Sequence, residues 1–315
     1  MLSERLGFRW VLIAAVAGTL AGAATVHAQG PRPIDVGYGR DGAITAAAFA
    51  VAGAMTLLPV DAQARWSHEL LPFDYRVRTN FSASAAKTSD ILLVLAIAAP
   101  AVRELTLGWN EETGKRSLVY AEALGAGLAL NAIAKYTVGR PRPYTYSEDP
   151  RIQAYSDHEG RDSRLSFFSG HACTTFAAAV AGGYLYSQAT TDTTARALTW
   201  GIGLTLASAT ANLRVRAGKH FYSDILVGAV VGAGVGTLVP YLHYRDRDHN
   251  ALSRGEWVAI GAGPIAGILI SQLLPFKRDI TLPLADPKAE SAPTVVLPWI
   301  APRGQGGGMM LARLF

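Results

Sequence analysis

Long apolar segments separated by short polar stretches recur along the chain from residue 42 to residue 274. They are too long for strands and mostly too apolar for amphipathic surface helices, so each one predicts a buried or membrane-embedded helix. The segments run approximately Gly42–Val60, Ile91–Leu107, Leu118–Tyr136, Ala172–Tyr186, Ala197–Leu213, Asp224–Leu242 and Trp257–Leu274. The sequence therefore predicts an all-α fold.

Several of these segments approach the roughly 20 residues that a helix needs to cross hydrocarbon. Gly228, Gly232 and Gly236 repeat at four-residue spacing, as on the small-residue faces where membrane helices approach closely. A soluble helical core rich in alanine is the alternative, since Glu122 and Asn131 interrupt one segment. We expect a multi-helix membrane-embedded bundle.

The two ends of the chain differ from its centre. Arg5 and Arg9 precede an apolar run that ends in Val26-His27-Ala28, so residues 1–28 are expected to be a cleaved secretory signal or an N-terminal anchor. Residues 276–315 are rich in proline and glycine and form a predicted irregular tail. Two extended pieces within it, Thr294–Ile300 and Met309–Phe315, either pair as a hairpin or stay loosely ordered. Residues 29–275 remain as the helical domain.

Composition and charge exclude several classes of protein. Apolar residues make up 50% of the chain and charged residues 17%, against roughly 25% charged in ordinary soluble domains. These values exclude a disordered chain, and the single cysteine, Cys173, excludes a disulfide scaffold. The net charge of +5 is not concentrated in a basic run, so no nucleic-acid partner is expected. No protein partner is predicted either.

Three polar clusters at the ends of apolar segments carry the candidate chemistry. The first is Lys135, followed after six residues by Arg142-Pro143. Pro141 and Pro143 stop the helix, and seven residues correspond to about two helical turns, so both cations can reach one place. Alone, this cluster also fits a positively charged helix end that complements the helix dipole.

The second cluster is Ser169-Gly170-His171, directly before an apolar helix. Free N–H groups at a helix start, a hydroxyl group and the absence of a Cβ at Gly170 can make a small anion-binding site. His171 would stand beside that anion and could give up a proton. A plain N-cap serine is the simpler interpretation of Ser169 by itself.

The third cluster places His220 five residues after Arg214 and Asp224 a further three residues on. A carboxylate bonded to one imidazole nitrogen fixes the tautomer and leaves the other nitrogen free to attack. Asp224 as a helix cap beside a chance histidine is the competing interpretation. Together the clusters suit a tetrahedral phosphate, and because no Cys/His or multi-carboxylate set shows metal-ligand spacing, neither a metal nor a cofactor is predicted.

The three clusters, in this order and spacing, resemble the signature of the type 2 phosphatidic acid phosphatase superfamily. That superfamily also includes bacterial class A acid phosphatases and vanadium haloperoxidases. The resemblance spans about residues 117–243, the expected catalytic core. Phe168 and Leu213 replace the proline and serine that precede Ser169 and Arg214 in the family, and Tyr222 stands where a proline is frequent.

The resemblance implies a phosphatase mechanism. His220 would attack phosphorus and become a phosphohistidine, Asp224 would orient it, and His171 would protonate the leaving group. The phosphate oxygens would be bound by Lys135, Arg142, Ser169, Gly170 and Arg214. The expected substrate is a lipid phosphate or diphosphate, with a soluble phosphomonoesterase, a vanadate-dependent haloperoxidase and a non-enzymatic transporter as alternatives.

The resemblance further implies about six core helices and a site at the outer face of a bacterial inner membrane, towards the periplasm. Helix parity conflicts with that orientation unless one early segment lies along the surface or packs without crossing. Outside the three clusters, the charged residues between 157 and 164 are expected in a solvated loop, where they could contribute to substrate access. His243 is expected at the surface.

Overall fold

The computed structural model describes residues 33–58, 70–244, 251–276, 294–300 and 307–313. The predicted signal or anchor over residues 1–28 and most of the predicted tail lie outside these ranges. Within them, the predicted apolar segments are all helical, which confirms the all-α fold. These helices are α2 (Tyr38–Met55), α3 (Ala83–Leu105), α4 (Glu111–Val138), α6 (Gly170–Ala189), α7 (Thr193–Arg216), α8 (Tyr222–His243) and α9 (Arg254–Leu273).

Shorter elements connect the long helices at one end of the bundle. They are the 3-10 turns η1 (Tyr75–Val77), η2 (Pro143–Tyr146) and η3 (Gly160–Arg164), and the helix α5 (Pro150–Glu159). Near the C-terminus, β1 (Thr294–Ile300) and β2 (Gly307–Arg313) pair antiparallel, with Thr294 opposite Arg313. The tail therefore contains the hairpin that the two extended pieces suggested.

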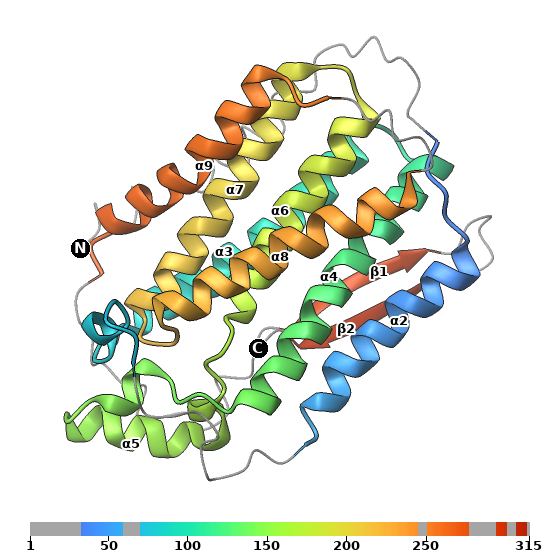
Figure 1. Cartoon of the computed structure of the whole chain (residues 1–315). Helices are drawn as coiled ribbons and strands as arrows, with labels where there is room; N and C mark the ends of the chain where they lie inside the picture. The colour runs from blue at the N-terminus through green and yellow to red at the C-terminus, as the bar shows by residue number, and fades with distance from the viewer. Residues whose placement is uncertain (1–32, 59–69, 245–250, 277–293, 301–306, 314–315) are drawn as a thin grey trace, which may run out of the picture.

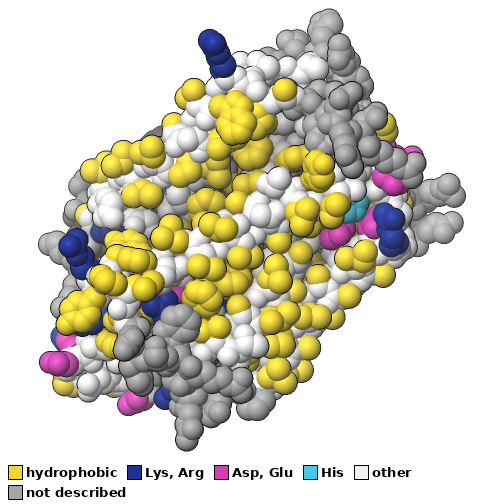
Figure 2. All heavy atoms as spheres, viewed as in Figure 1, with side chains coloured by type: hydrophobic (Ala, Val, Ile, Leu, Met, Phe, Trp, Pro, Cys, Tyr) yellow, Lys and Arg dark blue, Asp and Glu magenta, His cyan; other side chains and the backbone are white. Residues whose placement is uncertain are grey.

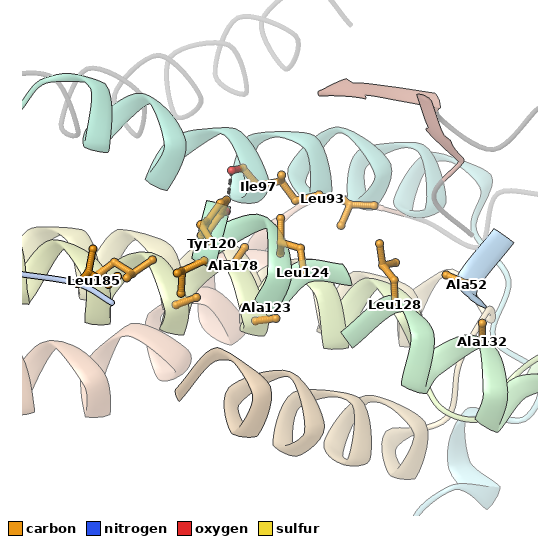
Figure 3. Close-up of a cluster of buried hydrophobic side chains, with 14 of the residues drawn as sticks. Ala52, Leu93, Ile97, Tyr120, Ala123, Leu124, Leu128, Ala132, Ala178 and Leu185 are labelled. Carbon is orange, nitrogen blue, oxygen red and sulfur yellow. Dashed lines mark hydrogen bonds between the residues drawn. The ribbon is translucent and has the colours of Figure 1, made fainter. Parts of the chain in front are cut away.

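Helix α6 occupies the middle of the bundle. It packs against α3, α4, α7 and α8, while α2 covers α4 and α9 covers α7 (Figure 1). Buried side chains from α3, α4 and α6 fill the space between them, among them Leu93, Leu124 and Ala178 (Figure 3). The Tyr120 hydroxyl donates a hydrogen bond of 2.8 Å to the carbonyl of Ile97, which satisfies the polar end of an otherwise apolar contact.

Local sequence sets where the site-bearing helices begin and end. The Asn110 side chain accepts a hydrogen bond from Thr113 N at the start of α4, and Gly139 ends that helix with φ of 63°, a left-handed conformation that favours glycine. Pro141 then prevents continuation of the helix. Ser169 caps α6 by accepting from Ala172 N. The polar clusters thus lie where helices stop or start.

The glycine repeat of α8 forms its contact with α6. A Cβ at Gly232 would lie 2.2 Å from the carbonyl oxygen of Cys173, and one at Gly228 would lie 2.6 Å from that of Ser169. Both distances are far inside van der Waals contact, so α8 approaches the α6 backbone as closely as it does only because these positions lack side chains. The predicted small-residue face is confirmed.

Within the described ranges, four helices are long and apolar enough to cross a membrane, namely α3, α4, α8 and α9. Figure 2 shows hydrophobic side chains spread over the face that α8 and α9 form. On these two helices Val230, Leu242, Val258 and Leu273 are each more than two-thirds exposed. An apolar face of this extent indicates a membrane protein. Helices α2, α6 and α7 are not among the four.

A buried ionic network ties the connecting segments to the bundle. The Arg140 guanidinium, after the end of α4, donates to Asp224 Oδ1 at 2.5 Å and to Asp74 Oδ2 at 3.0 Å. All three side chains are at most 1% exposed, and the guanidinium also stacks over the Phe221 ring at 4.2 Å. Since each of these charges is removed from water, each depends on its partner.

We expect Gly232→Ala to lower the stability of the folded protein, because the added Cβ would collide with the backbone of α6. Overpacking of this kind costs about 1–3 kcal/mol or more. Gly234 provides the matched control, because a Cβ there meets nothing within 4 Å on the same helix. Thermal unfolding in detergent should show a clear loss for Gly232→Ala and no loss for Gly234→Ala. Equal midpoints for the two variants would contradict the close approach of α8 to α6.

Replacement of Arg140 by methionine is expected to destabilise the protein by about 3–5 kcal/mol, because it leaves two buried carboxylates without their cation. Arg151→Met is the control, since Arg151 pairs with Asp149 at the surface and its side chain is 62% exposed. Chemical unfolding monitored by tryptophan fluorescence should separate the two variants. An Arg140→Met protein as stable as Arg151→Met would show that the network does not support the fold.

Candidate functional site

The three polar clusters meet at one end of the bundle, where α4 and α7 end and α6 and α8 begin (Figure 1). Each of the predicted site residues is buried. They are Lys135, Arg142, Ser169, Gly170, His171, Arg214, His220 and Asp224. The turn between α7 and α8 that carries His220 contains Gly218, with φ of 73°, and a Cβ there would lie 1.8 Å from the carbonyl oxygen of Asn80. Glycine is therefore required at this position.

The His220 imidazole is oriented by a backbone carbonyl. Its Nδ1–H donates to the carbonyl oxygen of Ser166 at 2.8 Å, and because a carbonyl can only accept, Nε2 keeps its lone pair. The sequence interpretation gave this role to Asp224, but Asp224 Oδ2 lies 3.7 Å from Nδ1, beyond hydrogen-bonding distance. The residue that bonds the ring directly was missed, because any residue type can supply a carbonyl.

Asp224 holds the segments that surround His220. Its Oδ2 accepts from the Ser166 hydroxyl at 2.6 Å and from Phe221 N at 2.8 Å, and its backbone carbonyl accepts from Ser169 N at 3.1 Å. The carboxylate thereby fixes both the carbonyl-bearing Ser166 and the residue next to His220. Asp224 also caps the start of α8, as the competing interpretation of this residue expected.

His220 lies in a strongly positive, water-poor environment. Burial lowers the pKa of His220 well below its ordinary value of 6.5, and positive neighbours lower it further. Those neighbours are Arg142, Arg214 and Lys135, with His171 contributing least. The ring is consequently neutral near pH 7. The neighbours that lower its pKa come from all three polar clusters, so the three clusters lie close enough to act on the same imidazole.

Two carboxylates bind the site cations from the more exposed side. Asp90 Oδ1 accepts from His171 Nε2 at 2.7 Å and from Arg214 Nη1 at 3.1 Å. Asp162 Oδ1 accepts from Arg142 Nη2 at 2.8 Å. The side chains of Asp90 and Asp162 are 38% and 40% exposed, whereas their cationic partners are buried. The carboxylates therefore stand between the cations and solvent.

Sequence reasoning did not single out Asp90, which lies directly before the apolar segment Ile91–Leu107, upstream of the three clusters. Asp162 was placed in a solvated loop, but the stretch from 150 to 164 is helical, as α5 and η3. Although burial opposes ionisation, the nearby cations, first among them Arg142, hold the pKa of Asp162 below its ordinary value. A lone acidic residue in a polar stretch gives no signal for such a contact.

Helix α5 borders the same site. Lys219, the neighbour of His220, donates from Nζ to Glu159 Oε2 at 3.2 Å and lies 4.9 Å from the centre of the Tyr155 ring. The carbonyl of Lys219 accepts from Arg142 Nη1 at 3.2 Å. These contacts connect α5 to both the first and the third polar cluster. Residues outside the motifs therefore help to hold the site residues in place.

One group of potential metal ligands could not be found from ligand spacing along the sequence. Among the described residues, Asp41, Glu122 and His243 each offer a ligand atom, and these atoms lie within 4.8 Å of one another although the residues are far apart in the sequence. They lie at the other end of the bundle, since His243 ends α8 and Asp224 is in its first turn. His243, expected at the surface, is only 7% exposed.

The comparisons with known proteins agree with this geometry. The sequence model of the PAP2 superfamily matches residues 116–248, a range that contains every predicted site residue. No solved structure matches the chain. Both the motif resemblance and the family match rest on the same helices, α4 to α8. Over residues 116–248 the chain is thus similar to the PAP2 superfamily, the type 2 phosphatidic acid phosphatase superfamily that the three clusters resemble.

Proposed function

We propose that the protein is a metal-independent phosphatase that hydrolyses a lipid phosphate or diphosphate through a phosphohistidine at His220. The match of residues 116–248 to the PAP2 superfamily supports a phosphatase or phosphotransferase. The observation that carries the finer proposal is the state of His220. Its Nδ1–H is bonded to the Ser166 carbonyl, its Nε2 keeps a lone pair and makes no hydrogen bond to the described part of the chain, and its surroundings are cationic. A neutral imidazole beside cations that attract phosphate is an activated nucleophile.

The reaction follows from these positions. His220 Nε2 forms a bond to phosphorus while the bond from phosphorus to the leaving oxygen breaks, and His171, entering the step as the imidazolium, gives its Nε2 proton to that oxygen and becomes neutral. Water then attacks the phosphohistidine, His171 takes the water proton, and inorganic phosphate leaves with His220 neutral again. Lys135, Arg142 and Arg214 would bind the equatorial oxygens, together with Ser169 and the N–H of Gly170 at the start of α6.

The carboxylates of Asp90 and Asp162 support a route for phosphate into the site. They bind Arg214, His171 and Arg142 from the exposed side. A phosphate that carries two negative charges offers these donors stronger partners than a single carboxylate does. The substrate would displace both side chains, and its leaving oxygen would take the place of Asp90 Oδ1 at His171.

The membrane-facing surface supports a lipid substrate. Lys135 lies near the end of α4 and Asp224 at the start of α8, two helices that are apolar and long enough to cross a membrane, so the site would lie at the depth of lipid headgroups. In this proposal residues 29–275 form the phosphatase domain, in the bacterial inner membrane. The signal-like residues 1–28 favour a site that faces the periplasm.

Replacement of His220 by alanine is expected to reduce phosphate release by at least about 10³-fold, because the nucleophile is removed. His158→Ala is the control, since His158 is exposed on α5. Purified proteins would be assayed with isoprenoid diphosphate, phosphatidate, phosphatidylglycerol phosphate, lipid A and a water-soluble phosphomonoester, with and without a chelator. A folded His220→Ala protein that keeps its activity would refute the proposal, and activity confined to the soluble ester would refute the lipid substrate.

The pH dependence of turnover should report the low pKa of His220. Protonation of Nε2 abolishes attack, so kcat/KM must fall as the pH falls through that pKa, and this acid limb should lie well below pH 6.5. Arg142→Gln removes a positive neighbour, which raises the pKa and moves the limb to higher pH. The profile would be measured between about pH 4 and 8 and corrected for ionisation of the substrate. A limb that stays in place in Arg142→Gln would contradict the assignment.

A further inference from the structure

A second polar group lies at the end of the bundle opposite the phosphate site. Asp41 is in the first turn of α2, Glu122 is on α4, and His243 is the last residue of α8. His243 Nε2 lies 3.5 Å from Glu122 Oε2 and 3.7 Å from Asp41 Oδ2. About 28 Å of helix separates His243 from Asp224, so this group takes no part in the chemistry at His220.

The tautomer of His243 directs a lone pair at the two carboxylates. Its Nδ1–H donates to the carbonyl of Val239 at 2.8 Å, and Val239 lies one turn earlier on the same helix. Nε2 is then the nitrogen without a proton in the neutral ring, and it is the atom that faces Asp41 and Glu122. Metal-binding histidines are held in the same way, with the second nitrogen bonded to a carbonyl or carboxylate.

Glu122 brings an unsatisfied oxygen into this group. The residue is 9% exposed, and its Oε2 is buried and makes no hydrogen bond to the described part of the chain. A buried carboxylate oxygen that has lost water without a donor in return is unfavourable. Asp41 differs, since it accepts from Gly37 N at 2.8 Å and pairs with Arg40, whose side chain is 63% exposed.

We propose that Asp41, Glu122 and His243 form a binding site for a divalent transition-metal ion of the zinc type. Two ligand atoms held about 2.1 Å from a tetrahedral ion lie roughly 3.4 Å apart, close to the distances from His243 Nε2 to both carboxylates. The ion would give Glu122 Oε2 its missing partner. One imidazole and two carboxylates leave a fourth position for water.

The donor set favours zinc over magnesium or calcium, because those ions prefer all-oxygen sites with six or more ligands. The three residues come from three helices, so the ion would fasten α2 to α4 and α8 at this end of the bundle. The exposed Arg40 would keep one contact with Asp41 or turn towards solvent. This inference goes beyond the proposed phosphatase and does not depend on it.

The test uses the full-length protein without a histidine tag, purified in detergent and stripped with a chelator. Zinc chloride is then added, and bound zinc is measured by mass spectrometry after desalting. We expect one equivalent per chain, a higher unfolding midpoint with zinc than with magnesium or calcium, and at least tenfold less bound zinc in Glu122→Gln and His243→Gln. Glu111→Gln and His158→Gln are the matched controls, since both residues are exposed, and they should bind zinc as the unmodified protein does.

A cobalt titration keeps the proposal testable if either variant fails to fold. The unmodified protein should develop the visible absorption of low-symmetry cobalt, saturate at one equivalent and lose the signal when zinc is added. Zinc binding that is equal in Glu122→Gln and Glu111→Gln, or no stoichiometric binding of zinc or cobalt, would overturn the proposal.

Discussion

The Arg140 guanidinium lies between the carboxylates of Asp74 and Asp224, and none of the three charges has appreciable contact with water. Buried charges must be paired, so this contact fixes the end of α4, the segment before α3 and the start of α8 relative to one another. Asp224 in turn holds Ser166, whose carbonyl orients His220. The geometry of the candidate nucleophile therefore depends on an ion pair that does not touch it.

The same requirement explains the rest of the site. Arg142 and Arg214 are buried, and each has a carboxylate partner at the exposed side, Asp162 and Asp90 respectively. Those partners hold the cations in place. In the proposed function a phosphate would replace the two carboxylates, so binding would exchange one set of charged contacts for another instead of creating new ones.

Much of this organisation follows from sequence, because apolar segment length predicts helices and the glycine repeat predicts the close approach of α8 to α6. The convergence of Lys135, His171 and His220 was expected from the three clusters taken together and from their resemblance to the superfamily signature. Contacts made by backbone atoms or by isolated acidic residues could not, since neither leaves a pattern, as Ser166 and Asp90 show. The grouping of Glu122 with His243 was missed for a related reason, because it depends on how three helices pack.

The central claim is that His220 Nε2 attacks phosphorus, and chemical trapping tests it most directly. The protein would be mixed with substrate carrying radioactive phosphorus, quenched in alkali within a turnover and digested to peptides. Phosphohistidine survives alkali and is lost in acid, so the account predicts an acid-labile label on the peptide that contains His220. A label on another residue, or direct transfer to water with inversion of configuration at phosphorus, would contradict it.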